Sequence, residues 1–180
     1  MPSPGRAGEA EYEALRNEIV GRNEFRHRMV ELTLVSAGVI LPAGLSIDDL
    51  AQVMFVYPVV VFFLAASWAH HGVGVLLAGD YLRTAFEDRS GGPGWESSWR
   101  RRRLARPFSL LAVVSSSGVF LTVQILTWGI GVTRFRYRPS DWVLAGLGAA
   151  AIVATVLLMR FYAGLQVSMG ERNGPAADQG

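Results

Sequence analysis

Apolar residues gather in four uninterrupted runs along the chain, with polar segments between them. The runs cover residues 29–45, 50–69, 108–131 and 142–159. Each has about 17 to 24 residues, the length that carries a helix across the hydrocarbon core of a bilayer. Strands of that length are unusual, and the runs lack the alternation of a membrane-spanning strand. The pattern predicts an all-α polytopic membrane protein, a bundle of four transmembrane helices.

The four predicted spans differ in how clearly they are marked. The run 108–131 contains no charged residue and is the plainest of the four. The run 29–45 is the shortest, with Glu31 near its start and Pro42 near its end. Pro58 lies near the middle of the second run, where neighbouring helices must compensate for the lost backbone hydrogen bond. The ends of the chain, residues 1–10 and 171–180, are poor in apolar residues and are expected to be disordered tails.

Helical segments are expected to continue the first two spans on one side of the membrane. Residues 11–28 lack proline and place Glu18 four positions before Arg22, so they predict a helix that runs on into the first span. The second span continues into a segment, residues 70–107, that begins with strong helix formers. We expect the two extensions to pack together. The residues predicted to make contacts there are Arg22, Arg26, Asp80, Arg83 and Glu87.

Arginine placement predicts the orientation in the membrane. The chain has 17 arginines, no lysine and 15 acidic residues, for a net charge of +2. Fourteen arginines lie before the first span, between the second and third, or after the fourth. By the positive-inside rule these segments are cytoplasmic, and so are both termini. Trp68, Trp128 and Trp142 lie at the predicted span ends, as residues of an aromatic belt do.

A dense basic segment precedes the third span. It contains Arg100, Arg101, Arg102, Arg103 and Arg106. Arginines beside a membrane attract anionic headgroups, so we expect these residues to anchor the chain to lipid. A role in nucleic-acid binding is disfavoured, because no other part of the sequence is suited to contacting bases. On the opposite side, residues 134–138 alternate arginine with aromatic residues, which predicts a short hairpin on the headgroups or a contact with an external ligand.

Candidate chemistry is sparse. The chain has no cysteine, which excludes disulfides and thiolate sites. His70 and His71 are adjacent and point about 100° apart on a helix, so no metal site or other cofactor is expected. No motif of a hydrolase or nucleotide-binding enzyme is present in usable form, and we expect no enzymatic activity.

Polar and small residues in the third and fourth spans favour helix packing. The third span carries several serines and threonines with Gln124, which either hold helices together or line a water-filled path. In the fourth span Gly146, Ala150 and Ala154 form a small-residue face suited to close helix contact. That face fits contact within the bundle or between subunits, and the sequence favours neither.

Several elements in order resemble a group of small bacterial four-helix integral membrane proteins of unassigned activity. They are the N-terminal segment EYEALRNEI, the span beginning YP and ending WAH, and the continuation GDYLRTAFE. The resemblance covers about residues 11–100 and implies no catalytic residue. The positions that carry it are Tyr12, Leu15, Arg16, Glu18, Ile19, Tyr57, Pro58, Trp68, His70, Gly79, Tyr81, Arg83 and Glu87.

These observations favour a non-enzymatic interaction or scaffold protein. It would lie in the bacterial inner membrane as a homo-oligomer, with anionic lipid headgroups and a cytoplasmic protein as its partners and no nucleic acid. The alternative is a small channel or pore-forming effector in which the third span lines the path.

Overall fold

A computed structural model describes the backbone of residues 4–47, 51–82, 84–85 and 106–171, and the side chains of residues 8–47, 52–82, 84–85 and 117–168. The described residues form four helices and no strand. These are α1 (Pro4–Ser46), α2 (Ala51–Leu82), α5 (Arg106–Thr133) and α6 (Pro139–Glu171). The prediction of an all-α chain with four helices is confirmed for this part of the chain.

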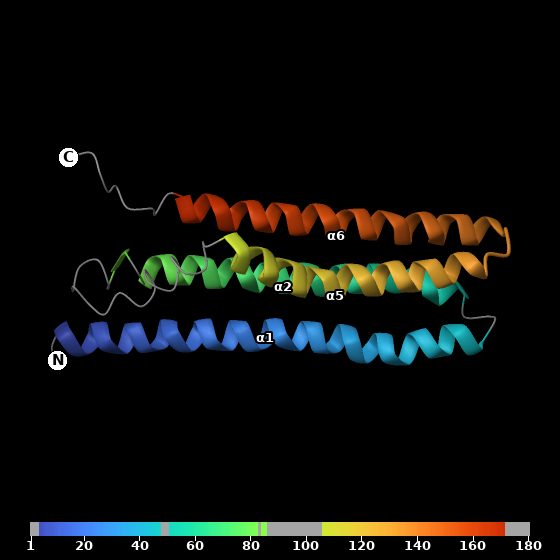
Figure 1. Ribbon diagram of the computed structural model, residues 1–180. Coiled ribbons are helices and arrows are strands. Elements are labelled where there is room, and N and C mark those ends of the chain that lie inside the picture. Colours follow the sequence, from blue (N-terminus) through green and yellow to red (C-terminus); the bar gives the residue numbers. More distant parts are fainter. Residues whose placement is uncertain (1–3, 48–50, 83, 86–105, 172–180) are drawn as a thin grey trace.

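The four helices run antiparallel in chain order, with the start of α1 and the end of α6 at the same end of the bundle (Figure 1). α2 lies at the centre and packs against each of the other three, while α1 and α6 lie on opposite sides of it. The core follows one face of α2, where Tyr57, Val61, Ala65 and Trp68 recur at helical spacing. The partners of this face on the other helices are Met29, Ala37, Phe120, Val123, Met159 and Tyr162.

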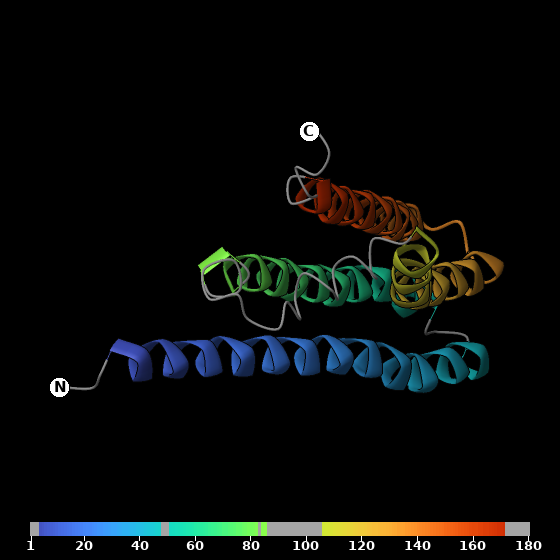
Figure 2. The ribbon, with the colours of Figure 1, turned by 60° about the vertical axis from the view of Figure 1, so that its left-hand side comes forward.

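α1 is a single helix of 43 residues, about 64 Å long at 1.5 Å per residue. The prediction that residues 11–28 form one continuous helix with the apolar run 29–45 is therefore confirmed. The helix begins at Pro4, inside the segment 1–10 that the sequence predicts to be a tail, and proline is suited to a first helical turn. Figure 2 shows the N-terminal end of α1 projecting beyond the other helices.

α6 also continues past its predicted span. It runs to Glu171, about three turns beyond Met159, where the apolar run of the sequence ends. The described residues thus contain three helical extensions at the same end of the bundle, from α1, α2 and α6, where the sequence predicts two.

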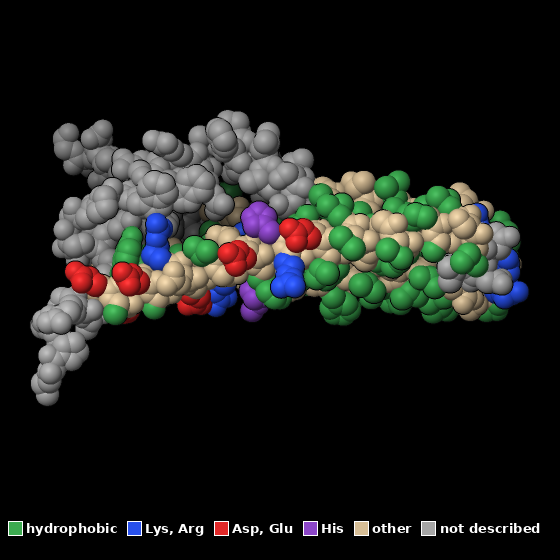
Figure 3. All heavy atoms as spheres, turned by 90° about the horizontal axis from the view of Figure 1, so that it is seen from below, with side chains coloured by type: hydrophobic (Ala, Val, Ile, Leu, Met, Phe, Trp, Pro, Cys, Tyr) green, Lys and Arg blue, Asp and Glu red, His purple; other side chains and the backbone are tan. Residues whose placement is uncertain are grey.

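Three helices are long and apolar enough to cross a membrane: those over Gly8–Ser46, Gln52–Leu82 and Pro139–Ser168. In α5 the stretch Ser117–Thr133 is apolar but shorter. Large apolar side chains also face outward along the bundle, with Val35 and Val39 of α1 each 68% exposed and Val143 of α6 71% exposed. Figure 3 shows that, on one face of the molecule, charged side chains lie over one half and mostly apolar side chains over the other.

The connection between α5 and α6 is a compact turn, not a hairpin. Asp141 lies in the first turn of α6 and its Oδ2 accepts hydrogen bonds from the backbone N–H groups of Arg136 and Arg138, at 3.2 and 3.3 Å. An acidic side chain that reaches back to the N-cap in this way is half of a capping box. Tyr137 between them has a φ of 58°, in the left-handed region that tightens the turn.

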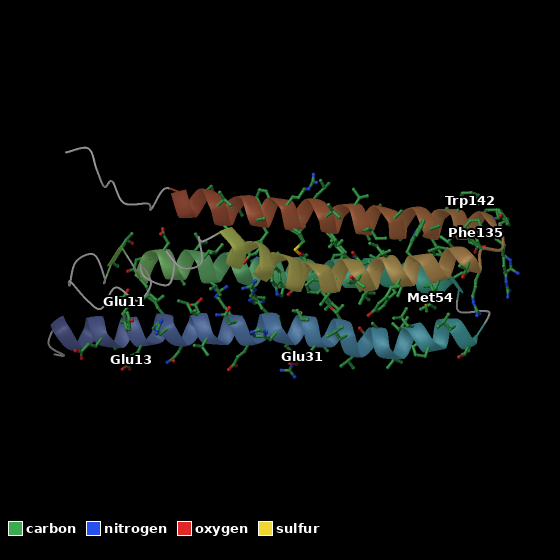
Figure 4. The ribbon with its side chains drawn as sticks, in the orientation of Figure 1. Glu11, Glu13, Glu31, Met54, Phe135 and Trp142 are labelled. Carbon is green, nitrogen blue, oxygen red and sulfur yellow. The ribbon has the colours of Figure 1, made fainter. Side chains whose placement is uncertain are left out.

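The aromatic residues of this turn lie against one another, although no strand forms among these residues. Phe135 packs against Trp142, with ring centroids 4.8 Å apart, and both lie together at the turn in Figure 4. Arg134 reaches the other way and donates to the carbonyl of Leu45, one of the last in α1. The carbonyls that end a helix lack partners within it, so Arg134 caps α1 and ties the turn between α5 and α6 to the end of α1.

Candidate functional site

α1 and α2 contact each other along their length, both at the level of the apolar runs and in the extensions. Ser36 and Tyr57 hydroxyls lie 2.6 Å apart in the spans, and Phe25 and His71 rings lie 4.4 Å apart in the extensions. Nearer the end, Tyr81 donates from its hydroxyl to Glu11 Oε1 at 3.0 Å. Figure 4 shows Glu11 between the two helices. The predicted packing of the two extensions against each other is therefore present.

The most concentrated group of charged and aromatic side chains lies where α1, α2 and α6 meet. The Cζ atom of Arg26 lies 4.1 Å from the ring centroid of Trp68 and 5.8 Å from that of Tyr162. Both rings are buried, at 5% and 2% exposure, and their centroids are 5.3 Å apart. Phe120 of α5 also packs edge-on against Trp68, with ring centroids 6.2 Å apart. A cation over an aromatic face is attracted by the ring quadrupole, so three helices hold this arginine in place.

Two glycines of α2 make room for this group. A Cβ atom at Gly72 would lie 2.7 Å from Tyr162 Cζ, and one at Gly74 would lie 2.7 Å from Arg22 Cζ. Carbon atoms do not approach so closely, so the side chains of α1 and α6 lie directly on the backbone of α2. We call the set Arg22, Arg26, Trp68, His71 and Tyr162 the arginine–aromatic cluster.

His71 is the histidine of the arginine–aromatic cluster. Its ring stacks against Phe25, and its Nδ1 atom is buried with no hydrogen-bond partner among the described residues. Burial lowers the pKa of His71, and the positive charges of His70, Arg22 and Arg26 lower it further. The side chain lies just beyond the predicted span 50–69. Burial is the larger cause, and the neighbouring positive charges add to it.

The structure places the predicted extension contacts differently. Arg22 donates from Nε and Nη2 to Glu18 Oε1 on its own helix, at 2.9 and 2.6 Å, and lies across from Gly74. Asp80 precedes Tyr81, which contacts Glu11, about three turns before Arg22 on α1. Sequence spacing fixes neighbours within a helix, but the offset between two helices is set by packing. Arg83 and Glu87 lie outside the described residues.

The predicted lipid anchors lie outside the described side chains. Arg106 begins α5, and its side chain is in that undescribed part, as are residues 100–103. Their role as headgroup anchors stays a prediction.

The small-residue face of α6 does not pack inside the bundle. Gly146 and Ala150 are exposed, and a Cβ at Gly146 would meet nothing within 4 Å. Ala154 is half-buried. The face that packs inward contains Gly148, where a Cβ would lie 2.7 Å from the carbonyl oxygen of Phe55, followed by Ala151 and Thr155.

Polar side chains at the level of the apolar runs are bonded within the bundle. Gln124 is fully buried and donates from Nε2 to the Pro58 carbonyl and to Thr155 Oγ1, both at 2.9 Å. Thr155 in turn donates to the carbonyl of Ala151. Gln124 thus joins α5 to α2 and α6, which is one of the two roles that the sequence leaves open for the polar residues of this helix.

Sequence reasoning missed Tyr162 and misplaced Trp68. Trp68 is predicted as a belt residue facing the headgroups, but it is buried in the bundle. Tyr162 follows the predicted end of the fourth span. One signal was available: Thr155, Met159 and Tyr162 continue a single helical stripe past Arg160.

The wider comparisons give no family. Neither protein-family models, nor curated protein sequences, nor solved structures match this chain. The resemblance to small bacterial membrane proteins stays a prediction. Among the side chains that the structure describes, no three His, Cys, Asp or Glu residues converge on a common point.

Proposed function

We propose that the chain is a bacterial inner-membrane protein that crosses the bilayer four times with both termini in the cytoplasm, and that it acts as a homo-oligomeric interaction protein without enzymatic activity. The observation that carries the proposal is the division of α1. Only its last 18 or so residues, from Met29 to Ser46, are mainly apolar, and the rest continues as a rigid helix. That length can display a charged surface well clear of a membrane.

The outward side of this extension supports an interaction role. Glu9, Glu13 and Glu24 are exposed along α1, while its inner side packs on α2. Val20 is 56% exposed among these charges. A rigid rod with acidic and apolar positions fits a cytoplasmic protein partner better than it fits a small-molecule substrate. We propose that α5, whose apolar stretch is shorter, also crosses the membrane as the third span. The orientation in the membrane is likewise proposed.

The alternative function, a pore lined by α5, receives less support. A conducting path needs polar side chains that face water, whereas Gln124 and Thr127 are fully buried and bond inside one chain. Thr122 is an exposed polar side chain of α5. We therefore favour the interaction protein. Ion flux through liposomes that contain the purified oligomer would reverse this preference.

The absence of cysteine makes the membrane placement directly testable. Single cysteines at Glu13, Val39 and Tyr137 report one position in the extension, one in the first span and one in the outer turn. We expect a membrane-impermeant maleimide to label Tyr137→Cys in intact spheroplasts and Glu13→Cys only in inverted vesicles. Val39→Cys should resist labelling until detergent is added. Labelling of Glu13→Cys from outside would overturn the orientation, and labelling of Val39→Cys from either side would overturn the span.

The oligomeric state needs a separate measurement. Mass photometry of the protein in nanodiscs should give more than one copy per particle. A uniform population of single copies would contradict the homo-oligomer while leaving the membrane placement intact.

A further inference from the structure

We propose that the outward face of α1, where its apolar run begins, is the contact between two copies of this chain, and that Glu31 of each copy pairs with Arg28 of the other. The inference rests on the proposed membrane placement and on the proposed homo-oligomer, and it names the surface that joins the copies. The residues of this surface follow one another at intervals of four and three positions, so they form one stripe on a helix. We call this stripe the α1 contact face; it consists of Glu24, Arg28, Glu31, Val35 and Gly38, all exposed.

Glu31 is the one charged residue within the four apolar runs. Its side chain is exposed and points away from the other helices (Figure 4). Among the described residues, none forms an ion pair or a hydrogen bond with this carboxylate. Ionisable side chains within a membrane almost always face the interior of a bundle or pair with an opposite charge. Glu31 does neither within one chain, so its counter-charge comes from outside the chain.

Arg28 supplies that counter-charge on the same face. It lies one turn before Glu31, is exposed, and forms no ion pair with another side chain that the structure describes. A two-fold contact brings residue i of one copy to residue j of the other, and j to i. A face that carries a carboxylate and a guanidinium one turn apart is therefore complementary to itself. A different protein would need a matching pattern of charges, whereas a second copy carries it already.

The proposed membrane placement sets how the two faces meet. Every copy crosses the bilayer in the same direction, so two α1 helices about a two-fold axis run parallel, with equal residues at equal depth. Glu31 of one copy then lies three residues, or about 4.5 Å along the axis, from the level of Arg28 of the other. An arginine side chain is long enough to bridge that offset. Glu24 lies one turn on the other side of Arg28, so each guanidinium has carboxylates of the second copy on both sides.

The apolar part of the α1 contact face leaves room for a second helix. Val35 is 68% exposed, and a Cβ atom at Gly38 would meet nothing within 4 Å. Glycine weakens a helix relative to alanine, and no contact with a described residue requires it at this position. Small residues let two helix backbones approach closely inside a membrane. Figure 3, which looks onto the outer side of α1, shows acidic and basic side chains adjoining the apolar half.

The chain has no cysteine, so cross-linking between single cysteines tests the contact directly. Val35→Cys lies on the α1 contact face, and Val153→Cys on the outer side of α6 is the matched control. The two side chains are 68% and 57% exposed, and each lies six residues from the predicted cytoplasmic end of its run. After oxidation with copper phenanthroline in native membranes, we expect Val35→Cys to run mainly as a disulfide-linked dimer and Val153→Cys to stay monomeric. Absence of the Val35→Cys dimer, or equal dimer in both variants, would overturn the contact.

Exchange of the two charges tests the ion pair. In the Val35→Cys background, Glu31→Arg brings two arginines from each copy together, and it should lower the cross-linked fraction in micelles about fivefold. Glu31→Arg with Arg28→Glu restores the complementary pattern and should restore the dimer. The exchange acts on association and leaves the fold of each chain intact, because both side chains are exposed, and circular dichroism checks this. Loss of the dimer in both variants, or in neither, would overturn the pairing of Glu31 with Arg28.

Mass photometry in nanodiscs separates failure of this contact from failure of the proposed homo-oligomer. Particles with several copies, formed by a chain whose Val35→Cys variant does not cross-link, would place the oligomer contact on another helix and overturn the α1 contact face alone. Particles with one copy would contradict the homo-oligomer itself, and this contact with it.

Discussion

The helices have an apolar half, at the level of the apolar runs, and a second half made of the extensions. Buried polar groups have different surroundings in these two halves. At the level of the apolar runs they are neutral and bonded locally: Thr33, Thr127 and Thr155 each donate to the carbonyl four residues earlier. In the extensions, Arg26 and His71 are ionisable and lie against aromatic rings. In the proposed membrane placement the apolar half lies in a bilayer core, which supplies no water to an unsatisfied group, so each hydroxyl there needs a permanent partner. The extensions would lie outside that core, where water is available and charge is tolerated.

The contrast extends to how the helices approach one another. In the apolar half α6 comes close to α2 through Gly148, which lies on the backbone of Phe55. In the extensions, Gly72 and Gly74 receive the side chains of Tyr162 and Arg22. Backbone against backbone leaves no freedom to adjust, whereas a side chain can move.

The largest expected effect is that of Gly148→Ala. The new methyl group would overlap the carbonyl oxygen of Phe55 and the ring of Trp128, so α2 and α6 must separate. We expect destabilisation by about 2–3 kcal/mol. Reversible denaturation in mixed micelles, followed by circular dichroism, measures it.

The matched control is Gly146→Ala, two residues away and facing outward. It should be neutral or stabilise by up to about 1 kcal/mol, since alanine is the better helix former. Equal effects at the two positions would contradict the orientation of α6 in which Gly148 faces α2 and Gly146 faces outward. Dissociation of the oligomer by Gly146→Ala would assign the outer face to contact between subunits.

Replacing Arg26 by methionine tests the charge in the extensions. The apolar stem is kept and the cation over Trp68 is lost, so we expect a loss of stability of about 1–2 kcal/mol. Arg28→Met should change stability by less than about 0.5 kcal/mol. If the two variants behave alike in thermal unfolding, the contact of Arg26 with the rings does not stabilise the fold.

A smaller effect is expected for Gln124→Leu in the apolar half. The change removes the bonds to the Pro58 carbonyl and to Thr155, but it also removes the Oε1 atom, which is buried without a partner among the described residues. Interhelical hydrogen bonds in membranes average about 0.6 kcal/mol, so the net loss should stay below about 1 kcal/mol. A loss of several kcal/mol would show that the polar network, not apolar packing, holds α5 in place.

The smallest effect is a pH dependence that comes from His71. Its pKa is lowered in the folded chain by burial and by the neighbouring positive charges, so the unfolded chain binds a proton more readily. Stability should therefore fall as the pH drops from about 7 through the unfolded value of about 6.5 and toward the folded one. Unfolding midpoints measured from pH 7.5 to 5.5 should decline in the native chain and decline less in His71→Gln. An identical slope in both proteins would exclude His71 as the source.

Properties of single helices were predictable from the sequence, whereas contacts between helices were not. The four apolar runs, the arginine asymmetry and the absence of proline from residues 11–28 are properties of the chain alone, and they predict four helices and the continuous α1. The partner of Arg22 was predictable only within its own helix, where Glu18 lies one turn away. Its neighbour across the interface depends on the offset between α1 and α2.

The sequence by itself determined the helices, their lengths in the apolar part and the distribution of charge along them, because these depend on local propensity and on burial in an apolar medium. Only the tertiary structure decided which side of each helix faces inward. In the proposed membrane placement lipid is as apolar as a protein interior, so the apolar run 142–159 of α6 carries little hydrophobic signal for its rotation. Close packing chose Gly148 over Gly146, and the same rotation carried Tyr162 to Arg26 and Trp68.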